Sequence, residues 1–133
     1  MKTIRIRADK VVKEATLNDS ETAEAIWQAL PLAGVVNRWG DELYFTVPVQ
    51  VDGAEDAHTE LEIGALAYWP PGQAFCVFWG PTPASIAREP RAASPVNVFG
   101  KVQNTPEDFA AVPHDATILI GRLAPWEQIN SMG

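Results

Sequence analysis

The first 17 residues alternate between apolar and polar side chains, which is the pattern of a half-buried β-hairpin. Residues 3–7 (TIRIR) alternate strictly, and residues 11–17 (VVKEATL) do so less regularly. The three residues between them, 8–10 (ADK), suit a turn. We therefore predict two antiparallel strands with one exposed face.

Residues 18–30 (NDSETAEAIWQAL) change to a helical period. Their apolar side chains recur at i, i+3, i+4 and i+7 and form one stripe, made of Ala23, Ile26, Trp27 and Leu30. Asn18, Asp19 and Ser20 are all possible N-caps, and Pro31 ends the helix.

Short apolar runs bounded by turn residues follow, and they predict a series of strands at residues 35–36, 41–47, 65–69, 74–79, 95–103 and 117–123. Residues 52–60 are polar and acidic, and residues 80–95 form a long loop with four prolines. A second, short helix is expected to begin with Thr105 as N-cap and Pro106 at its first position, and to end near Val112.

This order of elements predicts a mainly β protein, a closed barrel of about eight strands with two short helices. We expect one domain over residues 1–124 and an irregular tail over residues 125–133. Side chains fill the interior of a barrel of this size, so a ligand is expected at a mouth or on an outer face.

Composition excludes some partners. The chain has 133 residues with 10 Lys and Arg against 17 Asp and Glu, a net charge of −7, which opposes binding to nucleic acid and to an anionic membrane surface. The single cysteine, Cys76, cannot form an intramolecular disulfide and is expected to be a buried, inert thiol. No apolar run resembles a signal peptide or a membrane span, so we expect a soluble, cytoplasmic protein.

Several motifs resemble those of a small prokaryotic cyclophilin-like family of unassigned function. They are a WGDE-YF-PV stretch (39–49), a YWPPG hairpin (68–72), a G-x-TP loop (80–83) and an ASPVNV strand (93–98). The resemblance covers roughly residues 3–123 and implies the cyclophilin fold. Residues 96–102 with the helix after them, and the GQAFCV stretch (72–77), also resemble cyclophilin segments.

Cyclophilins are peptidyl-prolyl isomerases, but the resemblance does not carry their catalytic residues onto this chain. The isomerase arginine falls at Thr46, the histidine of the aromatic pocket near Val96, and the glutamine near Ala74. A guanidinium lowers the isomerisation barrier of about 18–20 kcal/mol by weakening amide conjugation, and threonine cannot replace that charge. We therefore do not expect a competent isomerase.

The RWGDE cluster (38–42) is the first candidate for a binding site. Arg38 could clamp an anion, and Glu42 could act as a general base or an acceptor. The alternative is structural, with a Gly-Asp turn and Trp39 capping the barrel. Tyr44 lies on the same strand face as Glu42, so both could line one pocket with Trp69 or Trp79.

The aromatic residues of the central hairpin are the second candidate: Trp69, Phe75, Phe78 and Trp79. They could form a stacking platform, although we expect about half of them to be core and Trp79 to be the exposed ring.

The long loop and the strand after it contain the remaining candidates. Arg88, Glu89 and Arg91 could belong to a charged lid, or to a solvated, salt-linked loop. Asn97 needs partners if buried, and it either pins the proline loop or points into the pocket.

We expect neither a metal nor a cofactor. The two histidines, His58 and His114, lack metal-ligand spacing with another His or Cys, and no phosphate-binding or dinucleotide-binding motif is present.

Three functions remain open. The first is a binding module that holds a small molecule or an extended, proline-containing peptide in a groove, with residues 81–95 as a lid; its wall would be Trp39, Glu42, Tyr44, Trp69, Trp79 and Asn97. The second is a weak peptidyl-prolyl isomerase. The third is an interaction role through a homodimer, with Trp126 and the edge near Pro48 as contacts.

Overall fold

The computed structural model describes residues 2–51 and 57–123, and it is mainly β. Its strands are β1 (Thr3–Ala8), β2 (Val11–Leu17), β3 (Leu32–Val35), β4 (Asn37–Arg38), β5 (Glu42–Thr46), β6 (Ala57–Glu60), β7 (Ala65–Trp69), β8 (Ala74–Phe78), β9 (Arg91–Val102) and β10 (Thr117–Leu123). There is one α-helix, α1 (Glu21–Ala29), and there are two short 3-10 helices, η1 (Pro70–Gly72) and η2 (Pro106–Ala111). Within the described residues, no helix is long and apolar enough to cross a bilayer.

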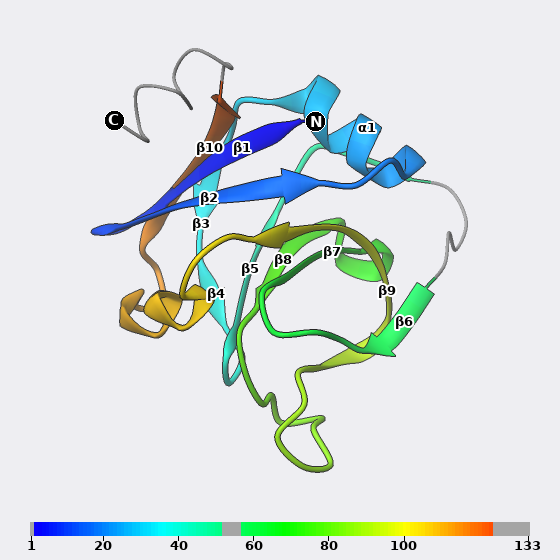
Figure 1. Ribbon diagram of the computed structural model, residues 1–133, viewed down its shortest axis with the longest axis vertical. Helices are drawn as coiled ribbons and strands as arrows, with labels where there is room; N and C mark the ends of the chain where they lie inside the picture. Colours follow the sequence, from blue (N-terminus) through cyan, green and yellow to red (C-terminus); the bar gives the residue numbers. More distant parts are fainter. Residues whose placement is uncertain (1, 52–56, 124–133) are drawn as a thin grey trace.

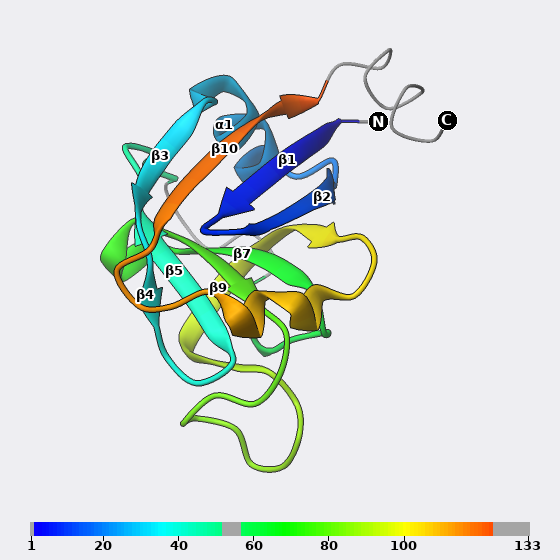
Figure 2. The ribbon, with the colours of Figure 1, turned by 90° about the vertical axis from the view of Figure 1, so that its left-hand side faces the viewer.

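The strands form one curved antiparallel sheet in the order β3-β10-β1-β2-β9-β7-β8-β5-β4, and β6 pairs with β9 beside this path. In Figures 1 and 2, α1 lies near the top of the view and η2 lies lower, with β1 and β2 between them. The loop between β8 and β9 projects away from the sheet in both views.

The expected closed barrel is not confirmed, because the hydrogen-bonded sheet does not close on itself within the described residues. Its two ends are β3 and β4, which follow each other in the chain and are joined through Val36. β3 pairs with β10 and β4 pairs with β5. The covalent chain, and not a strand pair, therefore links the two ends of the sheet.

The sheet has a buried cluster on each face. The larger cluster fills the concave interior, where Ile26 of α1 and Phe109 of η2 pack against strand residues. The smaller cluster lies on the outer face of the strands β8, β7 and β9; its buried members are Leu61, Ala65, Ala67, Ala74, Cys76, Phe78, Ala92 and Val96. Successive residues of β8 therefore belong in turn to the outer and to the interior cluster.

Several local predictions are confirmed. The first hairpin has the expected bounds within one residue, and β10 covers the predicted range 117–123. Ser20 is the N-cap of α1, where its side chain accepts a hydrogen bond of 3.0 Å from the Ala23 amide. Cys76 is buried and free.

Other local predictions are wrong in detail. β6 lies at the end of the polar stretch 52–60, where no strand was predicted, and β9 begins at Arg91, inside the expected loop. Thr105 adopts a left-handed conformation (φ 40°) and makes no backbone cap. Its hydroxyl donates instead to the Asp108 carboxylate at 3.0 Å. Trp126 and the predicted tail lie outside the described residues.

Candidate functional site

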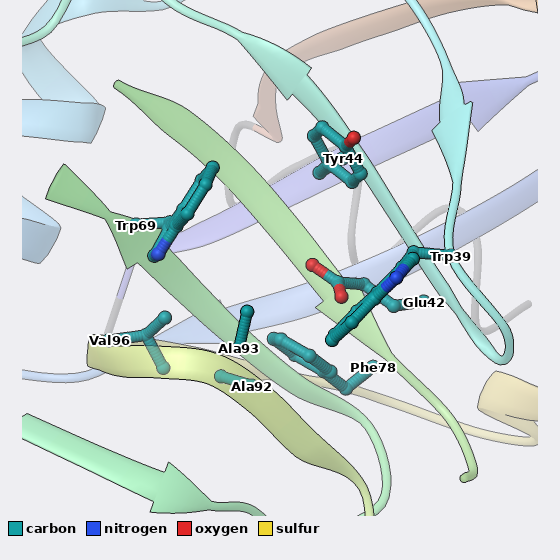
Figure 3. A pocket seen from close by; sticks show the side chains of 8 residues that line it. All are labelled: Trp39, Glu42, Tyr44, Trp69, Phe78, Ala92, Ala93 and Val96. Carbon is teal, nitrogen blue, oxygen red and sulfur yellow. The ribbon is translucent and has the colours of Figure 1, made fainter. Parts of the chain in front are cut away.

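A cavity of about 250 Å³ lies on the outer face of β5, β8, β7 and β9. Its walls combine three partly exposed aromatic rings, one carboxyl group and small or apolar side chains: Trp39, Glu42, Tyr44, Trp69, Phe78, Ala92, Ala93 and Val96. Figure 3 shows the Glu42 carboxyl pointing into the space between Trp69 and Tyr44, with the Trp39 ring beside it.

The turn before β5 places Trp39 and Glu42 at the cavity. The Trp39 amide donates to the Glu42 carbonyl at 3.0 Å. Gly40 has a φ of +63°, and a Cβ on it would come within 2.9 Å of the Thr82 Cα. Glycine is thus required both for the turn and for its close contact with the G-x-TP loop. The Asp41 amide donates to the Pro81 carbonyl at 2.9 Å, which joins the two motifs.

The YWPPG hairpin positions the opposite wall. A Cβ on Gly72 would lie 2.7 Å from the Trp69 ring, so the absence of a side chain makes room for that ring. The indole N–H of Trp69 donates to the Ser94 Oγ at 2.7 Å. The ring is therefore held by η1 on one side and by β9 on the other.

Alternation along β5 brings Glu42 and Tyr44 to the cavity while Leu43 and Phe45 point into the interior. On the paired strand β8, Phe78 lies opposite Glu42 and Cys76 lies opposite Tyr44. The antiparallel pairing therefore places the Cys76 thiol diagonally across from the Glu42 carboxyl.

Burial has the largest effect on the pKa of the Glu42 carboxyl. Glu42 is 6% exposed, and loss of solvation raises its pKa to about 7, while a hydrogen bond with Cys76 opposes the rise. The pKa of Cys76 is raised well above its usual range by burial and by the nearby carboxyl. Cys76 is thus a neutral thiol, and Glu42 is poised to gain or lose a proton near neutral pH.

Of the six residues expected to form the groove wall, four line this cavity, namely Trp39, Glu42, Tyr44 and Trp69, and Phe78 of the aromatic candidates lines it as well. Phe75 is elsewhere: it is fully buried on the inner face of β8, between Phe45 and Phe99. Asn97 is 1% exposed within β9 and is not among the lining residues.

The expectation that Trp79 is the exposed ring is wrong, since it is 5% exposed. Its ring packs against Phe109 of η2, with 6.0 Å between centroids, and the Arg38 guanidinium lies 4.9 Å from it. Arg38 donates to the carbonyls of Val112 (2.7 Å) and Gly40 (3.1 Å). It therefore fastens η2 to the turn and does not line the cavity.

Arg91 and the long loop form an internally bonded structure. The Glu89 carboxylate accepts from the amides of Ile86 and Ala87, both at 2.8 Å, and from the Arg91 Nε at 3.0 Å. The two amide bonds are the main reason that the pKa of Glu89 falls to about 2. This arrangement fits the salt-linked loop, and within residues 80–95 only Ala92 and Ala93 line the cavity.

Phe78 was among the aromatic candidates but not in the expected groove wall, and Ala92 and Ala93 were not candidates. Phe78 could have been assigned from alternation, because it shares the face of Ala74 and Cys76. Ala92 and Ala93 carried no signal, since small residues inside an expected loop suggest no site. Within the described residues, no group of three or more His, Cys, Asp or Glu side chains could hold a metal ion.

Comparison with known proteins gives two findings. A family model described as Cyclophilin-like matches residues 2–121. The solution structure of a hypothetical protein from Archaeoglobus fulgidus is similar, with a TM-score of 0.78 and 38% sequence identity over 92% of this chain and 95% of that one. No curated protein matches the chain.

Proposed function

The chain belongs to the cyclophilin-like family, and we propose that it is a binding module whose ligand occupies the cavity around Glu42. The ligand is a small molecule or part of an extended, proline-containing peptide. One observation carries the proposal: residues from separate motifs, Trp39, Glu42, Tyr44 and Trp69, line a single cavity.

The size and lining of the cavity support a small occupant. Its volume of about 250 Å³ is just below the roughly 300–1,000 Å³ of typical small-molecule pockets. Largely apolar walls with a few polar groups are the usual composition of such sites, in which the polar groups fix the orientation of the ligand. A small metabolite or a single side chain therefore fits better than a large ligand.

A fragment screen monitored by two-dimensional NMR tests the proposal. We expect shifts to cluster on the amides of β5, β8 and the start of β9, and Trp39→Leu to weaken binding about tenfold through loss of an aromatic wall. Trp27→Leu is the matched control, because Trp27 packs on α1 beside Arg122, whose guanidinium lies 4.8 Å from its ring. Shifts that map elsewhere, or equal losses in both variants, would count against the cavity as the site.

Weak peptidyl-prolyl isomerase activity is the second candidate. The position of the cavity favours this candidate, because it lies where the resemblance places the isomerase site. Val96, near the position of the isomerase histidine, lines the cavity. Thr46, at the position of the isomerase arginine, lies on the same strand face as Glu42 and Tyr44. Thr46 is exposed and uncharged, however, so the polarising cation that the resemblance implies is missing there.

A proline-peptide isomerisation assay at high protein concentration tests this candidate. We expect at most a slight acceleration by the wild type, and a larger one by Thr46→Arg if the missing charge is the main deficit. A wild-type rate equal to that of the uncatalysed reaction removes the candidate.

A further inference from the structure

Glu42 has no countercharge from the part of the chain that the structure describes. Among the described residues, burial raises its pKa and the neutral Cys76 thiol alone opposes this, with no contribution from Lys or Arg. Arg38 is bound to backbone carbonyls near Trp79, and Arg91 is paired with Glu89. Glu42 is also the one charged side chain among the described residues that line the cavity.

Three aromatic rings lie around the Glu42 carboxyl in the cavity. Trp39, Tyr44 and Trp69 are each partly exposed and lie around the carboxyl in Figure 3. Electron-rich ring faces attract an organic cation that lies within about 6 Å, tryptophan most strongly. An uncompensated carboxyl together with such rings is a combination that suits a positively charged, partly apolar group.

We propose that the cavity binds the cationic head of an organic ammonium compound, with Glu42 as its counter-ion and Trp39, Tyr44 and Trp69 as its walls. The inference rests on the binding function proposed above and names the chemical class of the ligand. The net charge of −7 favours the approach of cations over anions. Ala92 and Ala93 leave room for a branched head, because their side chains are small.

The competing possibility is a neutral ligand whose carbonyl accepts a hydrogen bond from protonated Glu42. The two differ in the sign of their pH dependence, because a cation needs the ionised carboxylate and a carbonyl needs the protonated acid. The other titratable groups on this face are Cys76 of β8, whose raised pKa keeps it neutral, and Tyr44 of β5. β7 contributes Trp69, and β9 contributes Ala92, Ala93 and Val96, none of which titrates.

The test uses choline and its uncharged isostere 3,3-dimethyl-1-butanol as probes in NMR titrations of the whole chain. We expect choline to bind at the cavity about tenfold more tightly at pH 8 than the isostere does. Between pH 6 and pH 8 the affinity for choline is expected to rise up to about tenfold as Glu42 ionises.

Glu42→Gln should abolish both the preference for choline over the isostere and the pH dependence of choline binding. Glu62→Gln is the charge-matched control, since Glu62 lies at the surface in an ion pair with Lys101. Trp69→Phe keeps an aromatic face and should retain the preference for choline. Retained preference in Trp69→Phe would show that a substitution in the cavity does not by itself abolish binding through misfolding.

The outcomes separate the two proposals. Equal or tighter binding of the isostere, or affinity for choline that falls with rising pH, overturns the cation inference and leaves the binding function standing. No choline binding at this cavity overturns the inference, and an empty fragment screen overturns the binding function as well. A peptide with one trimethyllysine shows the source of the cation: tighter binding than free choline indicates a peptide side chain, and equal or weaker binding indicates a free compound.

Discussion

At the scale of the single residue, Glu42 is the side chain whose surroundings most alter its chemistry. This carboxyl is 6% exposed and has no cationic partner among the described residues, and burial raises its pKa to about 7 from an ordinary value of 4.5. The folded state therefore binds this proton more tightly than the unfolded chain does. Burial of Glu42 should accordingly make stability depend on pH.

The first prediction concerns this dependence. The stability that comes from the higher folded-state pKa is fully present below pH about 4.5 and is lost as pH rises through about 7. The shift corresponds to a change on the order of 3 kcal/mol in unfolding free energy. Glu42→Gln should lack this loss, so its stability relative to the wild type should increase from pH 5 to pH 8.

Urea unfolding of both proteins at several pH values measures the difference. Glu62→Gln is again the control, because the loss of a surface carboxyl should leave the pH dependence of stability as it is in the wild type. If the difference in unfolding free energy between Glu42→Gln and the wild type stays constant over this pH range, burial does not hold the Glu42 carboxyl protonated.

At the scale of the element, a helix cap decides where α1 begins, and glycines that pack closely against neighbouring residues decide where two turns form. α1 begins at a serine cap, and its buried residues, including Ala23 and Ile26, join the interior cluster. The turn at Gly40 and the η1 hairpin at Gly72 each depend on a glycine for space against a neighbour. The two turns contribute the two tryptophan walls of the cavity, Trp39 and Trp69.

The second prediction tests the helix cap. Ser20→Ala removes the oxygen that accepts from the Ala23 amide and should lower the unfolding free energy by about 1 kcal/mol. Ser20→Asp retains an acceptor at the N-terminus of α1 and should keep most of the stability. Thermal and urea unfolding measure both variants, and an equal loss in both would mean that the hydroxyl does not act as a cap.

At the scale of the whole molecule, one sheet separates two apolar clusters with different roles. In the interior cluster the ring of Phe75 packs in a tilted arrangement against Phe45 and edge-on against Phe99, with centroid separations of 5.4 Å and 5.0 Å. The outer cluster underlies the cavity around Glu42. A change on the inner face of β8 should therefore affect stability without changing the chemistry of the cavity.

The third prediction uses this separation. Phe75→Ala should lower the unfolding free energy by about 3–5 kcal/mol, because it leaves a hole between two other rings. Phe75→Leu should cost less, and at temperatures where it is folded it should bind cavity ligands as the wild type does. A selective loss of ligand affinity in Phe75→Leu would show that the two faces are coupled.

Much of the fold follows from the sequence because it depends on neighbours in the chain. Alternation in residues 3–17 was enough to predict the first hairpin, and the apolar stripe with its polar cap residues was enough for α1. The motifs around Trp39 and Trp69 also indicated a cyclophilin-like family, which the comparison confirms.

Only the tertiary structure decided which candidates share the cavity. Pairing of β5 with β8 placed Glu42 and Tyr44 beside Phe78, and packing of η2 buried Trp79 beneath Arg38. These outcomes depend on strand register and on contacts between segments far apart in the chain, which local patterns do not encode. The sequence by itself therefore determined the elements and the family, while long-range pairing determined which side chains meet at Glu42.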